Sequence, residues 1–275
     1  MQKKFCIASK AWRYVDFFCK SPPLWGYAEN SLPNKQLDLL NIKKAELVCN
    51  KACIEFGQAC LKEEDIQGKK VIEVGSYDVN GSLRSDVESL NPQSYVGVDI
   101  VKGPGVDEIC DINDLITRYG RESFDLVIST ELMEHVRDWR NAVSNLKNIL
   151  KPKGLILLTT RSKGYGYHGY PFDFWRYEVE DMTVLFSDLS IEAIERDPLS
   201  PGVFVKAHKP VTFFESNLED YDLYSIVRGR RCRCISEFDI LFFKVKRTLR
   251  LFLSRILPTP VKTIIKKVFF QGERI

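Results

Sequence analysis

The sequence predicts an α/β fold built on a doubly wound, mostly parallel sheet, with helical extensions at both ends of the chain. Short apolar runs alternate with amphipathic segments from Gly68 to Pro210, a pattern typical of parallel βαβ units. Several of these runs end in glycine, acidic or hydroxyl residues, and such sheets bind ligands at the carboxyl ends of their strands. With 275 residues, 44% hydrophobic and 28% charged, the chain has the size and composition of one substantial globular domain with appendages.

The first 66 residues predict an extension that precedes the sheet. Residues 1–33 combine aromatic side chains with three prolines, which predicts a short aromatic segment and a proline-broken loop. Apolar residues then recur at helical spacing from Asn34 to Glu64, and Gln67-Gly68 ends this predicted helix.

Residues 67–210 form the predicted sheet domain, in which seven apolar runs predict seven strands. The predicted strands are Val71–Val74, Tyr95–Ile100, Glu108–Cys110, Phe124–Ser129, Leu155–Thr160, Ser190–Arg196 and Val203–His208. The predicted helices between them are Ser82–Leu90, Trp139–Leu150 and Val179–Phe186.

Residues 211–275 predict a basic amphipathic tail of a different kind. Two helix-like stretches, Phe238–Leu257 and Pro260–Phe270, are apolar on one side and rich in Lys and Arg on the other. From Ser225 to Ile275 there are thirteen Lys and Arg against three Asp and Glu, leaving 27 against 34 in the rest of the chain. A tail of +10 on a body of −7 indicates a partner or a charged surface for the tail.

The eight cysteines predict reduced thiols in a cytosolic protein, because the amino terminus does not resemble a secretory leader. Cys49, Cys53 and Cys60 share one face of the predicted helix, as small buried side chains do. Cys232-Arg-Cys234 lacks the partners that a metal site needs, so no metal centre is predicted. No uncharged apolar stretch is long enough to span a bilayer.

The first predicted strand ends in a loop, Glu73-Val74-Gly75-Ser76-Tyr77-Asp78, that can cradle a nucleotide-like ligand. Gly75 allows a sharp turn and a close approach of the ligand to the backbone. Gly81 and Ser82 then open the next helix, with Ser82 as a candidate N-cap. Alone, this pattern more often marks a plain strand-to-helix connection.

Two further strands end in polar residues. Asp99 lies 24 residues after Gly75, where a carboxylate can accept hydrogen bonds from both ribose hydroxyls, although a surface carboxylate or a helix cap is the alternative. Phe124–Ser129 continues into TELMEH, whose polar residues are expected to line the cleft at this edge of the sheet.

Taken in order, the segments VIEVGSYDVNGS, YVGVDI, CDIND, FDLVISTELMEHV and LKNILKPKGLILLTT resemble the class I, Rossmann-like S-adenosylmethionine-dependent methyltransferases. They are nearest to the type 11 group, which acts on small molecules, lipids or sugars. The resemblance extends over roughly Gly68 to Pro210, and the whole ordered set carries it. It implies a Rossmann-like fold and S-adenosylmethionine as the cofactor.

The resemblance also implies where the cofactor is held. The loop after the first strand would pass under its methionine part, the end of the second strand would hold the ribose and flank the adenine, and the residues after Glu108–Cys110 would meet the adenine ring. Thr130, just after the fourth strand, would line the methyl-donor pocket. The residues so implied are Glu73, Gly75, Ser76, Tyr77, Asp78, Asp99, Ile100, Asp111, Ile112 and Thr130.

The loop departs from the family at one position. Its usual form is Gly-x-Gly-x-Gly, whereas this chain has Tyr77 at the second glycine and reaches its next glycine at Gly81. We expect Tyr77 to cover the cofactor. A nicotinamide oxidoreductase, the competing enzyme class, shares Gly75 and Asp99 but needs glycines at Tyr77 and Asn80.

Methyl transfer to oxygen is an in-line displacement in which the enzyme positions the reacting atoms and supplies a base for a hydroxyl acceptor. His135 follows the cleft-lining strand, and imidazole is the side chain best suited to this role near neutral pH. The loop from Gly164 to Tyr177, rich in glycine and aromatic residues, offers His168 as a second base and Asp173 as its orienter. A helix-capping or packing role for His135 and an aromatic loop folded onto its own domain are the alternatives.

The basic tail predicts attachment to an anionic membrane surface through residues 238–270, with apolar side chains in the interface and Lys and Arg among the headgroups. A helical hairpin packed on the domain or on a second copy is the alternative, and the oligomeric state is left open. Nucleic acid is the least favoured partner, because the face opposite the charges is rich in Phe, Leu and Ile.

The sequence therefore predicts a cytoplasmic S-adenosylmethionine-dependent methyltransferase, peripheral at the inner face of the membrane. Its expected acceptor is a sugar, a lipid-linked glycan or another small molecule, methylated on oxygen. A non-catalytic, membrane-docked adaptor with the same fold is the alternative from a different functional class.

Overall fold

The structure is a computed structural model that describes residues 51–79, 81–169 and 172–256. The predicted aromatic segment 1–33, residues 34–50 of the predicted first helix and the predicted helix 260–270 lie outside these residues. Chain contacts divide the protein into two compact units, Met1–Leu47 and Val48–Ile275, and all described residues belong to the second. The predicted domain limits at residues 66 and 210 stay a prediction.

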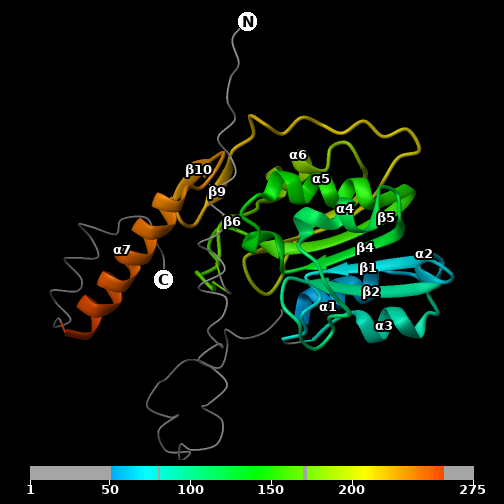
Figure 1. The fold of residues 1–275 in the computed structure, drawn as a ribbon, viewed down its shortest axis with the longest axis horizontal. Helices are drawn as coiled ribbons and strands as arrows, with labels where there is room; N and C mark the ends of the chain where they lie inside the picture. The colour runs from blue at the N-terminus through cyan, green and yellow to red at the C-terminus, as the bar shows by residue number, and fades with distance from the viewer. Residues whose placement is uncertain (1–50, 80, 170–171, 257–275) are drawn as a thin grey trace, which may run out of the picture. The chain divides into compact units, whose positions relative to one another are not determined.

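A seven-stranded sheet forms the centre of the second unit (Figure 1). Its order is β3 (Glu108–Ile109), β2 (Ser94–Asp99), β1 (Lys70–Val74), β4 (Phe124–Thr130), β5 (Leu150–Arg161), β8 (Gly202–His208) and β7 (Ser190–Arg196). From β3 to β5 every neighbouring pair is parallel, and β8 is antiparallel to both of its neighbours. The predicted α/β class and its mostly parallel sheet are confirmed.

Helices cover both faces of this sheet (Figure 1). On one face lie α1 (Lys51–Cys60), α2 (Glu63–Ile66) and α3 (Arg84–Ser89), and on the other α4 (Leu115–Tyr119), α5 (Trp139–Ile149) and α6 (Val179–Leu185). In β1, Val71 belongs to the core that contains Phe56 of α1, whereas its neighbour Ile72 belongs to the core that contains Leu146 of α5. Alternate residues of a strand point to opposite faces, so strands buried on both faces are continuous apolar runs.

The order of the strands positions the site. Strand β1 lies between β2 and β4, and the chain crosses to one side of β1 and then to the other. At such a switch point the loops leaving the carboxyl ends of adjacent strands diverge and open a crevice for a ligand. The loops after β1, β2, β4 and β5 therefore leave the same edge of the sheet.

Some short elements were not predicted from the sequence. The helix α4 and a second sheet of β10 (Arg230–Cys232), β9 (Leu223–Ser225) and β6 (Trp175–Arg176) are absent from the expected pattern. Strands of two or three residues are too short to show a period of two, and β6 pairs with a segment far along the chain. Strand β5 also begins at Leu150, five residues earlier than expected, with an irregularity before Leu155.

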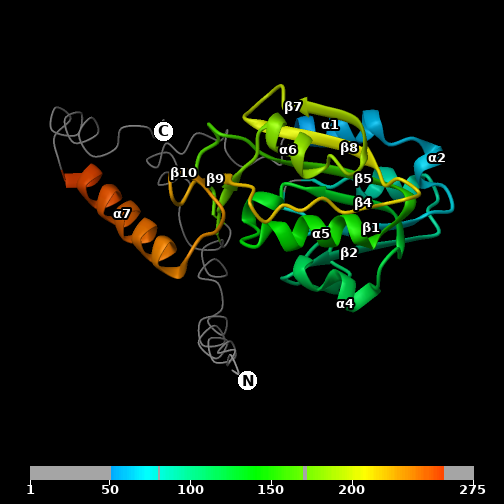
Figure 2. The ribbon, with the colours of Figure 1, turned by 90° about the horizontal axis from the view of Figure 1, so that it is seen from above.

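The first helix of the basic tail is confirmed as α7 (Glu237–Ile256), which continues the chain beyond β10 (Figure 2). Its amino-terminal end is joined to the sheet domain by Arg137, which donates to the Ile235 carbonyl at 2.9 Å and forms an ion pair with Glu237. Among the described residues, no helix is long and apolar enough to cross a membrane.

Candidate active site

The loop after β1 turns away from its strand at Gly75, whose φ is +81°. This left-handed backbone conformation strains any residue with a side chain. A Cβ at Gly75 would also lie 3.0 Å from the side chain of Leu132, in the loop after β4. The glycine thus allows the loops after β1 and β4 to approach each other closely.

Asp99, the last residue of β2, turns its carboxylate toward the loop after β1. The amide of Tyr77 donates to Oδ2 of Asp99 at 3.4 Å, and the amide of Val101 donates to Oδ1 at 3.1 Å. The amide of Asp78 donates to the carbonyl of Pro104 at 2.9 Å, which fastens the loop after β1 to the loop after β2. We call residues 75–78 together with Asp99 the cofactor strip.

The Tyr77 ring packs on Gly103 in the loop after β2. A Cβ at Gly103 would fall 1.9 Å from Cε2 of Tyr77, so only glycine leaves room for the ring. The ring of Tyr77, which stands where the family's loop usually has a glycine, is thus accommodated by a glycine of the loop after β2. This contact places the tyrosine over the turn that follows Asp99.

Two buried hydroxyl groups fit a polar ligand at this edge. Ser76 and Ser129 are 2% and 0% exposed, and neither Oγ has a hydrogen-bond partner among the described residues. Buried polar atoms are normally paired, so such atoms indicate an absent partner. Together with the glycine turn and the Asp99 carboxylate, they fit the amino-acid and ribose parts of S-adenosylmethionine.

Glu73 lies within the body of β1 and ties neighbouring elements together. It is 2% exposed, and it accepts from the hydroxyl of Tyr95 at 2.6 Å and from that of Ser82 at 3.2 Å. Burial raises the pKa of Glu73 to about 7, against the lowering effect of these two hydrogen bonds.

The other residues implied for the cofactor lie at the same edge in different environments. Ile100 is 54% exposed after β2, and Thr130 is half-buried at the end of β4. Asp111 is exposed and its carboxylate accepts from the Asn113 amide at 2.9 Å as an N-cap, whereas Ile112 is buried in the core. The part each plays in binding stays a prediction.

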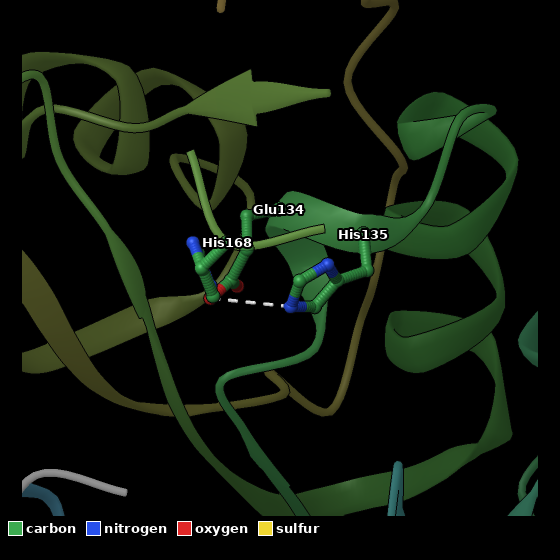
Figure 3. Close-up of side chains that lie close together, drawn as sticks. All are labelled: Glu134, His135 and His168. Carbon is green, nitrogen blue, oxygen red and sulfur yellow. Dashed lines mark ion pairs between the residues drawn. The ribbon is translucent and has the colours of Figure 1, made fainter. Parts of the chain in front are cut away.

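A second group of polar residues lies where the loops after β4 and β5 meet. Glu134, His135 and His168 lie close together, and Figure 3 shows both imidazoles beside the Glu134 carboxylate. The Oε1 atom of Glu134 lies 3.5 Å from Nε2 of His168 and 3.9 Å from Nε2 of His135. We call these three residues the histidine cluster. The predicted residues His135 and His168 are thus neighbours in space, with ring centroids 4.8 Å apart.

The opposite nitrogen of each imidazole is held by an acceptor. Nδ1 of His135 lies 2.5 Å from the carbonyl oxygen of Phe172, and Nδ1 of His168 lies 3.1 Å from Oδ2 of Asp173. Carbonyl and carboxylate oxygens only accept, so each Nδ1 carries a proton and each Nε2 faces the cluster. Asp173 thus contacts His168, and its predicted orienting role stays a prediction.

Asp173 is itself fixed and charged. It is fully buried and pairs with the Arg176 guanidinium, whose NH2 group donates to Oδ2 at 2.6 Å. Burial opposes ionisation, but the hydrogen bonds and charges of Arg176 and His168 hold the pKa of Asp173 well below its usual range. For His168, burial lowers the pKa, but its contacts with Asp173 and Glu134 raise it to about 9.

Two glutamates connect the cluster to the sheet. Oε2 of Glu134 accepts from Thr160 at 2.8 Å, and Oε1 of Glu131 accepts from Thr159 at 3.1 Å. Glu131 also pairs with Arg161. Burial and the charge of Glu134 raise the pKa of Glu131 to about 7, against the opposing effect of Arg161. Burial acts on Glu134 in the same direction, but the imidazoles of His168 and His135 more than offset it and lower its pKa.

The sequence had placed Glu134 in the cleft without giving it a role, and Glu131, Thr160 and Arg176 were not singled out. The TELMEH segment carried a signal, because it places two carboxylates and an imidazole directly after a strand. Their partners come from β5 and from the loop after it, and no local pattern links these to β4.

Comparison with known proteins identifies a family and several relatives. A family model described as a methyltransferase domain matches residues 48–197, more than half of the chain. Two ubiquinone biosynthesis O-methyltransferases, from two strains of Rhizobium etli, are each 26% identical over 139 residues, 46% of this chain and 54% of theirs. The chain spans about half the length of the curated relatives it matches.

Two solved structures show a partial likeness. One is an S-adenosylmethionine-dependent methyltransferase from Mesorhizobium loti, 18% identical, covering 58% of this chain and 99% of that chain with a TM-score of 0.47. The other is a Burkholderia thailandensis 1,6-didemethyltoxoflavin-N1-methyltransferase with bound 1,6-didemethyltoxoflavin and S-adenosylhomocysteine. It is 13% identical and covers 63% of this chain and 83% of that chain, with a TM-score of 0.47.

The family match extends from α1 to the strand β7, and it contains the loop after β1, Asp99 and the TELMEH segment. The resemblance predicted from the ordered motifs is confirmed: the chain belongs to the class I, Rossmann-like S-adenosylmethionine-dependent methyltransferases.

Proposed function

We propose that the protein transfers a methyl group from S-adenosylmethionine to a hydroxyl oxygen of a small acceptor at an anionic membrane surface. The observation that supports it most is the histidine cluster, which lies beside the cofactor strip. Leu132, which Gly75 approaches, lies two residues before Glu134. The expected cofactor and the groups that can act on an acceptor proton thus share one edge of the sheet.

When bound, S-adenosylmethionine supplies a methyl group on a positively charged sulfur. Gly75 and Ser76 would hold its methionine part, with Glu73, Tyr77 and Asp78 completing the loop. Asp99 would accept from the ribose hydroxyls. The adenine would lie against Ile100, Asp111 and Ile112, and Thr130 would line the pocket of the methyl group. The chain's contribution is to hold the two reacting atoms together and to exclude water.

A hydroxyl acceptor must also lose its proton to become an efficient nucleophile. His135, oriented by the Phe172 carbonyl, is the group placed to accept this proton. His168, held by Asp173 and with its pKa raised to about 9, would accept it only in alkaline solution. The names of the curated relatives, which are O-methyltransferases, support oxygen as the acceptor atom.

The loop between β5 and β6 supports an acceptor with a ring or an apolar body. Tyr165, Tyr167 and Phe172 are half-buried there and flank His168. Aromatic faces of this kind stack on sugar rings and cover lipid or quinone-like groups. A sugar, a lipid-linked glycan or another small amphipathic molecule is the acceptor class we propose.

Helix α7 supports a membrane location. Seven of its large apolar side chains are at least half exposed: Phe238, Leu241, Phe242, Val245, Leu249, Leu251 and Phe252. Most of them recur every three or four residues, which makes one stripe along the helix. The apolar stripe requires an apolar layer as its partner, and the helix belongs to a tail of charge +10, which requires negative charge. An anionic bilayer has both properties, and we propose that the protein docks there from the cytoplasmic side.

Incubation of the purified full-length chain with S-adenosylmethionine carrying a labelled methyl group and with membrane glycan and lipid extracts tests the proposal. The expected result is an acceptor that gains one methyl group on oxygen, located by fragmentation mass spectrometry. Thermal shifts with S-adenosylhomocysteine and NAD run in parallel, because a ligand that binds the folded state raises its stability.

The outcomes separate the competing classes. Stabilisation by S-adenosylhomocysteine without transfer to any extract would favour the non-catalytic adaptor. Stabilisation by NAD alone would favour an oxidoreductase and contradict the proposal. Asp86→Asn, in the first turn of α3, is the matched control, because its carboxylate contacts only Gln58 in the described residues and should leave transfer unchanged.

A further inference from the structure

We propose that the histidine cluster is a binding site for a divalent transition-metal cation, held by Oε1 of Glu134, Nε2 of His135 and Nε2 of His168. This inference deepens the proposed function. The binding site itself is argued from geometry, and only the role of the cation in methyl transfer rests on the proposed function. Two imidazole nitrogens and one carboxylate oxygen are a ligand set that binds Zn²⁺, Mn²⁺ and Fe²⁺ and leaves further coordination positions open.

The distances favour a shared cation over direct contact. One ligand atom from each of the three residues lies within 4.8 Å of the others, and the carboxylate oxygen lies 3.5 and 3.9 Å from the two imidazoles. Ligands around a cation with bonds near 2.1 Å stand roughly 3.0 to 3.5 Å apart, so small side-chain shifts complete the site. The separations in the cluster are too long for good hydrogen bonds.

The third histidine of the chain shows what a direct pair looks like. Nε2 of His208 lies 2.7 Å from Oε1 of Glu192 at the protein surface, a normal hydrogen-bonded contact. In the histidine cluster, two imidazoles approach one carboxylate oxygen and neither closes on it. A cation between the three side chains accounts for that spacing.

The outer contacts fix the imidazoles as metal ligands require. Their Nδ1 atoms are engaged by Phe172 and Asp173, which leaves the Nε2 atoms directed inward. Metal-bound histidines almost always donate their other N–H to a carboxylate or a carbonyl in this way. The Asp173–His168 pair is held in turn by Arg176.

The carboxylate ligand provides an independent observation. Glu134 is fully buried, and its Oε1 has no hydrogen-bond partner among the described residues, while its other oxygen accepts from Thr160. An unpaired buried carboxylate oxygen is costly unless a positive partner reaches it. A divalent cation that displaces the Nε2 proton of His168 would supply that partner at bonding distance.

The position of the site indicates what the cation does. The site lies at the edge that carries the cofactor strip, so a coordination position that the three residues leave open would be available to the acceptor. With both imidazoles bound to it, the cation would replace them in assisting the proton loss: it would stabilise the deprotonated form of a bound hydroxyl, and the proton would be released to water. The methyl acceptor would then be a molecule whose hydroxyl oxygen can bind the cation. This restricts the class of acceptors more than the presence of a nucleophilic atom does.

Isothermal titration of the chelator-treated full-length protein with Zn²⁺, Mn²⁺ and Mg²⁺ tests the site without any acceptor. We expect one site per chain, with Zn²⁺ binding more tightly than Mn²⁺ and Mg²⁺ binding weakest. His168→Asn and Glu134→Gln should each weaken Zn²⁺ binding at least tenfold. His208→Asn is the matched control, because it removes the histidine that is already paired, and it should leave the affinity unchanged.

A second measurement shows whether each variant is still folded. Binding of S-adenosylhomocysteine reports a folded cofactor site in every variant, and the Co²⁺-loaded protein should show a visible absorption band that His135→Asn alters. Protein that binds S-adenosylhomocysteine but none of the ions would overturn the site, as would equal Zn²⁺ affinity in the His168→Asn and His208→Asn variants. Methyl transfer that persists in such a metal-free protein would leave the proposed function standing while removing this inference from it.

Discussion

Phe243 of α7 packs against Tyr167, with ring centroids 5.0 Å apart, and thereby connects the basic helix to the residue next to His168. Arg247 lies 4.6 Å from the centre of the same tyrosine ring, and Lys244 lies 4.5 Å from the centre of the Phe172 ring. One side of α7 thus contacts the loop that orients both imidazoles, while its apolar stripe faces outward. The helix proposed to dock on lipid and the loop that serves the acceptor are in direct contact.

Phe243→Ala should therefore impair methyl transfer without impairing cofactor binding. Loss of one aromatic pair costs about 1 kcal/mol, so the catalytic efficiency toward a soluble acceptor should fall roughly fivefold. Steady-state kinetics together with the affinity for S-adenosylhomocysteine would measure both effects. Phe242→Ala, one position away on the exposed stripe, is the control and should leave this activity unaltered. Equal kinetics for the two variants would show that the contact does not serve the site.

The double variant Phe242→Ser, Leu249→Ser should release the protein from membranes. Two large apolar side chains together contribute about 3 kcal/mol to partitioning, so binding to phosphatidylserine-containing vesicles should fall roughly a hundredfold. Point substitutions suit this test better than truncation at residue 225, because Cys232 and Ile235 beyond it are buried in the core. Vesicle co-sedimentation at two salt concentrations is the measurement.

Leu199→Ser provides the control for this experiment, since Leu199 is 63% exposed and lies outside α7. It should bind vesicles as the parent protein does, and neutral phosphatidylcholine vesicles should bind both poorly. Unchanged binding of the double variant to anionic vesicles would contradict docking through the stripe.

Asp99→Asn should weaken binding of the cofactor. A hydrogen bond to a charged group contributes about 1.5 to 3 kcal/mol, so the dissociation constant of S-adenosylhomocysteine should rise roughly ten- to a hundredfold. Calorimetric titration of this variant beside Asp86→Asn would isolate the effect from a general loss of charge. An affinity equal to that of the parent protein would exclude Asp99 from the ribose site.

Glu73→Gln should change how stability depends on pH. The folded protein holds the Glu73 proton up to a pKa of about 7, whereas an unfolded glutamate releases it near 4.5. Between these values the folded state binds more protons, so the free energy of unfolding falls as pH rises and levels off above about 7. The variant lacks this titration, so its stability relative to the parent should rise between about pH 4.5 and pH 8 by on the order of 3 kcal/mol.

Urea unfolding at about pH 5 and about pH 8, below and above the pKa of Glu73 in the folded protein, would measure most of the difference. The glutamine amide introduced at this position can still accept from Tyr95 and donate to Ser82, so the local packing is retained. Glu219→Gln, which changes an exposed carboxylate, should show no such gain. A stability difference that is the same at both pH values would refute the raised pKa as the cause.

Much of the fold could be predicted because its strands are buried on both faces. The runs Val71–Val74 and Phe124–Ser129 are mostly apolar, and each lies within one residue of the strand observed. The short elements could not be predicted, since β6 exists through its pairing with β9 and not through any periodicity of its own. Propensity and pattern describe a segment, whereas pairing depends on a partner.

The sequence by itself determined the family and the order of its motifs. It placed Gly75, Asp99 and the TELMEH segment after successive strands, and parallel strands bring such segments to one edge whatever lies between them. The tertiary structure alone decided that His168 joins His135 at the Glu134 carboxylate, and that Asp173 and Phe172 turn both imidazoles inward. The path of a glycine-rich loop is set by the contacts it makes after folding, and these contacts leave no periodic trace in the sequence.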